Sequence, residues 1–182
     1  MEHESLYTAA KWDILKVLER GPRSPLEISN ELKASLANVS QQIRLLELAG
    51  ILTSERVPNR DKGQPRVLYR IAGDLAYAIA TSGDFVDKKL LKLSEMNKIV
   101  LRAWFIDDPA VRHALEKALW AIEPKLAKVR TLAYAGLVKG VPVLEYAGDA
   151  DLPATVRVDG PFGAVTLRKS AQPKGHQLLE RR

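Results

Sequence analysis

Cysteine is absent from this sequence and histidine is scarce. The chain has no cysteine and three histidines, His3, His113 and His176. Without cysteine there can be no disulfide bond, no thiolate metal site, no cysteine nucleophile and no thiol-based redox switch. The three histidines are scattered, so a histidine-rich metal centre within one chain is not expected. We therefore expect no metal and no cofactor.

Long apolar runs and familiar catalytic motifs are also missing. No stretch approaches the roughly 18 consecutive apolar residues that a membrane-spanning helix needs. The start of the chain carries acidic residues where a signal peptide has a basic and then an apolar segment, which predicts a cytoplasmic protein without membrane association. The motifs GxxxxGK[ST], GxGxxG, HExxH and GxSxG do not occur. An enzymatic role is therefore not expected.

The composition is that of a globular chain with a locally basic surface. Of the 182 residues, 46% are hydrophobic and 27% are charged, and the formal net charge is +6. This length allows one large domain or two small ones. The stretch from Arg56 to Arg70 has five basic residues and one acidic residue, Asp61. Such a local basic excess is typical of a surface that meets an anionic partner.

The first seventy residues have the pattern of three helices followed by a hairpin. Ser24 can cap a helix whose first residue is Pro25. The third helix has an apolar stripe at spacings of three and four, formed by Leu36, Val39, Ile43 and Leu46. A polar loop bracketed by Pro58 and Pro65 follows a strand pattern and precedes another. The predicted elements are helices at 6–20, 24–33 and 35–48 and strands at 52–57 and 66–71.

Two segments of this part carry a resemblance to a known family. They are SLANVSQQIRLLELAGILTSERV, over the third helix and first strand, and RDKGQPRVLYRI, over the loop and second strand. With the order of the helices, they resemble the winged helix-turn-helix regulators of the ArsR/MarR type, which are common in archaea and bacteria. The resemblance covers residues 8–72, which is less than half of the chain.

The resemblance implies that the third helix enters the major groove of duplex DNA while the loop contacts the backbone or the minor groove. The residue types agree, because side-chain amides match the edge of adenine, arginine matches guanine or phosphate, and serine matches phosphate oxygens. The same polar surface would also be compatible with simple solvation or with RNA or protein binding. The predicted DNA-binding residues are Ser35, Asn38, Ser40, Gln41, Gln42, Arg44, Arg60, Lys62, Gln64 and Arg66.

A second domain is predicted after residue 80. Residues 75–80 are expected to form a short helix, and the turn chemistry of 81–84 marks the boundary. A long helix is then predicted from Asp84 to about Ile106, because apolar residues repeat at spacings of four and three, as in helices that pair. Packing of this helix inside its own domain is the alternative. The predicted dimerisation residues are Val86, Leu90, Leu93, Asn97, Val100 and Trp104.

The remaining part has a mixed pattern. Asp108-Pro109 can open a helix that runs to about Ile122. Pro124 opens a further segment, whose outward residues Lys125, Lys128 and Arg130 are expected to be solvated. The segments 131–135, 141–146, 155–159 and 164–168 are predicted as strands, and 171–182 as a flexible tail. The fold class is thus α+β, with domains at 1–80 and 81–170: an N-terminal winged helix-turn-helix, then a long helix and a smaller C-terminal α+β domain.

One segment, 132–146, resembles the strand–glycine loop–strand of nucleotidyltransferase-like domains. That family holds magnesium with paired acidic residues on the second strand, where this chain has Val141 and Val143. Two-metal phosphoryl transfer needs converging carboxylates, so the chemistry of that family is not expected here. The acidic residues nearby are Glu145, Asp149 and Asp151.

The sequence as a whole predicts a sequence-specific transcriptional regulator that binds double-stranded DNA as a homodimer. The C-terminal part is expected to pair the subunits, and an unknown small-molecule effector is left open as a further partner. Two alternatives from other classes remain. One is a winged-helix module that binds a protein and not DNA, and the other is a nucleotidyltransferase-like protein that handles nucleotides.

Overall fold

A computed structural model describes residues 7–58 and 65–181 of the chain. The chain divides into two compact units, Met1–Lys92 and Leu93–Arg182. The sequence places this boundary at residue 80, and the shift arises because the segment that follows the first hairpin folds with the N-terminal unit. No helix in the described residues is long and apolar enough to cross a bilayer.

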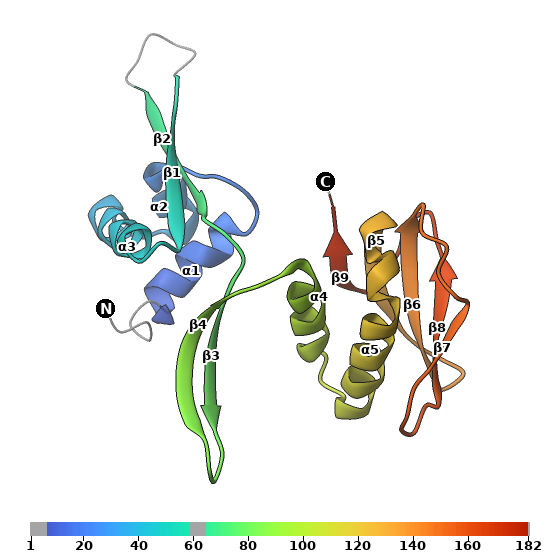
Figure 1. Ribbon diagram of the computed structural model, residues 1–182. Coiled ribbons are helices and arrows are strands. Elements are labelled where there is room, and N and C mark those ends of the chain that lie inside the picture. Colours follow the sequence, from blue (N-terminus) through green and yellow to red (C-terminus); the bar gives the residue numbers. More distant parts are fainter. Residues whose placement is uncertain (1–6, 59–64, 182) are drawn as a thin grey trace. The chain divides into compact units, whose positions relative to one another are not determined.

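Three short helices form the centre of the N-terminal unit (Figure 1). They are α1 (Ala9–Leu18), α2 (Pro25–Leu32) and α3 (Leu36–Leu48), which confirms the three predicted helices. Each contributes one apolar stripe to a shared core, in which Ile14, Ile28 and Leu46 are fully buried. Burial of these stripes, more than helix propensity, holds such short helices together.

A two-stranded hairpin follows, as predicted. Strands β1 (Leu52–Val57) and β2 (Arg66–Ile71) pair antiparallel, and the register places Leu52 opposite Ile71. Leu52 is buried in the core of the unit, so the base of the hairpin is fixed by packing. Arg23, just before α2, forms an isolated bridge with Tyr69 of β2. Helices, hairpin and bridge together make a winged helix-turn-helix.

The next segment corrects the sequence interpretation. Residues predicted as a short helix and the start of a long one form a second hairpin, β3 (Leu75–Thr81) and β4 (Val86–Lys92). In place of the predicted long helix, the structure has the shorter helix α4 (Glu95–Trp104). The side chain of Ser94 caps its start by accepting a hydrogen bond from the backbone amide of Asn97. The residues with the predicted helical spacing are divided among a strand, a linker and a helix, so they do not form one helical face.

The predicted dimerisation residues are separated accordingly. Val86 and Leu90 lie on β4, Leu93 lies in the linker, and Asn97, Val100 and Trp104 lie on α4. Val100 is buried in the core of its own unit, which is the alternative that the sequence left open. A helical seam through all six residues is therefore wrong.

The C-terminal unit is a sheet with two helices against one face (Figure 1). Helix α5 (Pro109–Ile122) begins at Asp108, whose carboxylate accepts hydrogen bonds from two backbone amides, and a short 3-10 helix, η2 (Glu123–Lys128), follows it. The strands are β5 (Val129–Val138), β6 (Val141–Gly148), β7 (Thr155–Arg157), β8 (Ala164–Lys169) and β9 (His176–Glu180), in the spatial order β7-β8-β6-β5-β9.

The end of the chain also departs from the prediction. Residues expected to be a flexible tail include β9, which pairs antiparallel with β5 and buries Leu178 and Leu179. The α+β class, with an N-terminal helix-turn-helix and a mixed C-terminal part, is confirmed. The four predicted strands of this part are also present, with bounds that differ by a few residues.

Candidate nucleic-acid interface

The outward face of α3 presents polar side chains on a well-anchored helix. Val39, Ile43 and Leu46 are buried against the core of the unit. At 100° per residue, Gln41 and Arg44 lie on the opposite side of the helix, and both are exposed. Neither side chain makes a hydrogen bond or ion pair within the described residues. These two residues are thus positioned by the helix and available to a ligand.

The other predicted residues of α3 lie around this face. Ser40 is exposed on one flank. Asn38 and Gln42 lie on the other flank and are linked, because the Gln42 side-chain amide donates to Asn38 Oδ1 at 3.2 Å. They line a small hollow of about 130 Å³ against α1. Of the amides predicted to read bases, Gln41 is therefore the one on the outward face.

Ser35 holds the start of α3. Its hydroxyl oxygen accepts a hydrogen bond from the Asn38 amide at 3.3 Å, and its backbone is extended, as at a helix N-cap. A serine hydroxyl can accept one hydrogen bond and still donate its proton. Ser35 can therefore cap the helix and contact a phosphate at the same time.

Arg66 is tied to the helix-turn-helix. Its guanidinium donates to Glu27 Oε1 on α2 at 2.6 Å, and both side chains are about half exposed. The pKa of Glu27 is lowered to about 2, first by hydrogen bonds from the amide and hydroxyl of Ser24 and then by Arg66. The ion pair joins β2 to α2, so Arg66 positions the hairpin as well as presenting charge at its surface.

At the start of α2, the backbone amides of Ser24 and Glu27 are already hydrogen-bonded within the chain. Glu27 Oε2 accepts hydrogen bonds from the Ser24 amide at 2.7 Å and from its hydroxyl at 2.8 Å. The Ser24 hydroxyl oxygen in turn accepts from the Glu27 amide, which completes a capping box. The carboxylate of the chain itself takes the place that an external phosphate would occupy.

The loop of the first hairpin contains three predicted contacts, Arg60, Lys62 and Gln64, which lie outside the described residues. The strands that lead to it carry Arg56 and Arg70, both exposed. These two arginines belong to the basic stretch seen in the sequence, although the predicted DNA-binding residues do not include them. The signal that points to them is that local basic excess itself.

The acidic residues of the nucleotidyltransferase-like segment do not converge. Glu145 is buried, forms an ion pair with Arg168 and accepts a hydrogen bond from the Lys174 amide at 3.1 Å. These contacts, Arg168 first, lower the pKa of Glu145. Across residues 7–58 and 65–181, no three histidine or acidic side chains come close enough to hold a metal ion.

The comparison with known proteins agrees with this geometry. Residues 13–55 match the family model of a helix-turn-helix domain, from within α1 to within β1. The search of curated proteins found no match for the chain. The matched segment contains α2, α3 and the turn between them, which are the elements that present Gln41 and Arg44. The N-terminal unit therefore contains a helix-turn-helix domain, the type of domain found in DNA-binding regulators.

Proposed function

We propose that this protein is a sequence-specific transcriptional regulator of the ArsR/MarR type that binds double-stranded DNA as a homodimer in the cytoplasm, and that it is not an enzyme. The observation that carries the proposal is the outward face of α3, where Gln41 and Arg44 are exposed and without intramolecular partners in the described residues. The match to a helix-turn-helix domain supports it independently.

The two side chains are spaced for base reading. Gln41 and Arg44 are three residues apart, so they lie almost one helical turn from each other on the same side of α3. A glutamine amide can donate and accept at the edge of adenine, and an arginine can donate twice to guanine. A helix that carries both can therefore distinguish neighbouring base pairs in the major groove, which is wide enough to admit it.

The first experiment is selection from a randomised library of duplex DNA at near-physiological salt, followed by sequencing. The proposal expects an enriched motif with two inverted half-sites about one helical turn apart. Binding without enrichment would contradict sequence-specific reading and would indicate a backbone-only contact. Absence of binding to every duplex would favour the protein-binding alternative.

Arg44→Ala then tests the reading face itself. The proposal expects this variant to lose about 1–3 kcal/mol of binding to the selected motif and to tolerate other bases at one position. Arg157→Ala is the matched control. Arg157 is exposed on β7 of the other unit, and its replacement by alanine removes the same positive charge. Equal losses in the two variants would mean that net charge, and not base contact, governs affinity.

The proposed homodimer rests on the second hairpin. Ile79, Phe85 and Val86 are large, apolar and more than half exposed. In the part of the chain that the structure describes, β3 and β4 pair only with each other, so β4 has a free edge. An exposed edge of this kind can pair with another strand.

We infer that β4 of a second copy pairs with that edge. If two β4 strands pair antiparallel about a two-fold axis at Lys88, Asp87 of each copy lies opposite Lys89 of the other. The same register places Val86 opposite Leu90 of the other copy, and it also places the two Lys88 side chains opposite each other, which is an unfavourable pair. Opposite charges and apolar pairs that face each other across strands both stabilise a sheet. The symmetric register makes each of these contacts twice.

A charge swap tests this interface. Asp87→Lys would place lysine opposite lysine and should shift the protein towards monomer in sedimentation-velocity experiments. The double variant Asp87→Lys/Lys89→Asp restores opposite charges and should restore the dimer. Within the hairpin both positions face alanine, Ala80 and Ala78, so the swap leaves cross-strand charge pairs inside one chain unchanged. A dimer that is insensitive to both variants would contradict this interface.

A further inference from the structure

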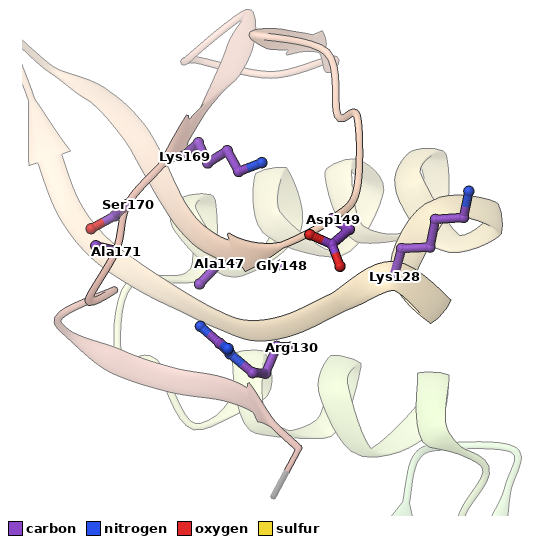
Figure 2. Close-up of a pocket in the computed structure, with 8 residues that line it drawn as sticks. All are labelled: Lys128, Arg130, Ala147, Gly148, Asp149, Lys169, Ser170 and Ala171. Atoms are coloured by element: carbon purple, nitrogen blue, oxygen red, sulfur yellow. The ribbon is translucent and has the colours of Figure 1, made fainter.

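A pocket of about 480 Å³ lies at one end of the sheet of the C-terminal unit, where β6 and β8 finish. We call it the strand-end pocket (Figure 2). Its volume is in the range of sites that bind small molecules. The polar side chains that line it are those of Lys128, Arg130, Asp149, Lys169 and Ser170, and Gly148 lies at its base.

The backbone brings these residues together from separate parts of the chain. Strands β6 and β8 are parallel, so their carboxyl ends, Gly148 and Lys169, lie at the same end of the sheet. Strand β5 runs antiparallel on the other side of β6, and its first residues lie at that same end. Ligands of sheets with parallel strands commonly bind just beyond the carboxyl ends of those strands.

Two local irregularities shape the pocket. The register between β5 and β6 shifts between Val129 and Thr131, so Arg130 is the extra residue of a bulge, a feature that redirects a side chain. Gly148 has a φ of +129°, and a Cβ atom there would lie 2.8 Å from the amide nitrogen of Arg130. Only glycine allows the two strands to approach this closely at the base of the pocket.

The charge of the pocket is unbalanced. Lys128, Arg130 and Lys169 make no side-chain hydrogen bond or ion pair within the described residues. Figure 2 shows Lys128 at the rim with its amine directed outward, while Arg130 and Lys169 come from the two strands that flank β6. Three cations without partners therefore surround one hollow, where they raise its affinity for an anion.

One acidic residue shares the pocket. The Asp149 carboxylate lines the same wall and also has no partner within the described residues. A carboxylate repels a phosphate but accepts hydrogen bonds from hydroxyl groups. Ser170 adds a hydroxyl whose oxygen accepts from the Gln172 amide at 3.3 Å and whose proton is available. The donors and the acceptor thus fit a ligand that carries both a phosphate and hydroxyl groups.

We propose that the strand-end pocket binds a small phosphorylated sugar or nucleoside. Arg130 and Lys169 hold the phosphate from two sides, Lys128 adds charge at the rim, and Asp149 accepts from a hydroxyl group of the sugar. The pocket lies wholly within the C-terminal unit, so this binding does not depend on DNA. In a regulator, the pocket would be the effector site.

Isothermal titration calorimetry of the full chain without DNA tests the proposal. The probes are ribose 5-phosphate, inorganic phosphate and ribose, each at constant ionic strength. Ribose 5-phosphate should bind more tightly than inorganic phosphate, and ribose should not bind measurably. Arg130→Gln/Lys169→Gln should weaken binding of ribose 5-phosphate at least about tenfold, because it removes the charged donors.

The matched control is Lys139→Gln/Arg157→Gln. Both residues are exposed, make no ion pair within the described residues and lie away from the pocket: Lys139 in the β5–β6 turn and Arg157 opposite Ala164 at the start of β8. This variant loses the same charge and should bind as the unmodified protein does. Asp149→Asn should reduce the preference for ribose 5-phosphate over inorganic phosphate.

Two results would overturn the proposal. One is no binding of ribose 5-phosphate by the unmodified protein; if duplex DNA binding then depends on Arg130 and Lys169, the phosphate that they contact is that of the DNA backbone. The other is an equal loss in the two double variants, which would mean general electrostatic attraction. A failure of DNA binding alone would affect the proposed function but not this site.

Discussion

The two hairpins of the N-terminal unit have the same secondary structure but different attachments. The first, β1–β2, is joined to the helices by backbone hydrogen bonds between Arg23 and Tyr69 of 3.0 and 2.8 Å and by the ion pair of Arg66 with Glu27. The Ser54 hydroxyl also donates to Glu47 of α3 at 2.6 Å. These polar contacts fix the direction of the hairpin relative to α3.

Within the described residues, the second hairpin, β3–β4, has more exposed apolar surface than the first. Leu75 packs against the core at its base, and Tyr77 stacks on Tyr7 with ring centroids 5.6 Å apart. Farther along, Ile79 is 63% exposed and Val86 is 76% exposed. An isolated two-stranded hairpin is only marginally stable in water. In the function proposed above, the first hairpin would serve positioning and the second would serve association.

Matched truncations at the bases of the hairpins should show the largest effect. Leu52 begins β1 and is buried, whereas Leu75 begins β3 and is half buried. Leu52→Ala should lower the free energy of unfolding of the N-terminal unit by about 2–4 kcal/mol because it leaves a cavity. Leu75→Ala should cost less than about 1.5 kcal/mol because less surface is buried.

Hydrogen exchange at increasing urea concentration, resolved by mass spectrometry, would follow the N-terminal unit separately from the C-terminal one. Protection in α3 should fall sharply in Leu52→Ala and little in Leu75→Ala. Similar losses of protection in the two variants would contradict the proposed difference between the hairpins, because they would show that both hairpins are equally integrated into the core.

Glu27→Gln should have an intermediate effect that depends on pH. The folded pKa of Glu27 is about 2, below its ordinary value of 4.5, so its stabilisation is present above pH 4.5 and is lost as the pH falls towards 2. We expect a cost of about 1 kcal/mol at pH 7, a modest value because a helix cap is worth about that much and the side chain is partly screened by solvent.

Thermal unfolding of Glu27→Gln between pH 2 and 7 checks this expectation. The variant and the unmodified protein should converge as the pH approaches 2. Glu31→Gln is the control, because Glu31 pairs with exposed Arg20 at 2.7 Å but caps no helix. It should change stability by less than about 0.5 kcal/mol. Identical pH profiles for the two variants would assign the effect to surface charge and not to the capping box.

The helix-turn-helix could be predicted because its signals are local. Ser24-Pro25 marks the start of α2, and the capping box that the structure contains involves residues only three apart. The stripe of α3 repeats at helical spacing over thirteen residues. In contrast, β3 is rich in alanine, which favours helices. Val86, Leu90 and Leu93 have the spacing of a helical stripe, but they lie on a strand and in a linker.

The strand-end pocket could not be predicted because it depends on pairing between distant segments. Lys128 and Arg130 appear in the sequence as the solvated face of one segment, and Lys169 appears near the end of the last predicted strand. Only the parallel pairing of β6 with β8 brings Lys169 beside them. Strand β9 was missed for the same reason, since its partner β5 lies more than forty residues earlier in the chain. The sequence pattern within a single strand does not show which distant strand it pairs with.

The smallest effect on folding is expected when an exposed β-branched apolar residue of each hairpin is replaced by threonine. The same pair of changes separates the two hairpins most clearly. Val86→Thr keeps the shape and strand propensity of an exposed residue, so the free energy of unfolding of the monomer should change by less than about 0.5 kcal/mol. If Val86 faces Leu90 of a second copy, the dimer should weaken by about 1–2 kcal/mol, since the symmetric contact is lost twice.

Ile71→Thr at the end of β2 is the counterpart on the first hairpin, where the residue is 40% exposed and lies beside Trp12. It should leave the dissociation constant of the dimer unchanged, because its apolar contacts are within the chain. Sedimentation equilibrium of the two variants measures the difference directly. Weakening of the dimer by Ile71→Thr and not by Val86→Thr would reverse the roles of the hairpins. Association would then involve the first hairpin, β1–β2, and the free edge of β4 would not be the dimer interface.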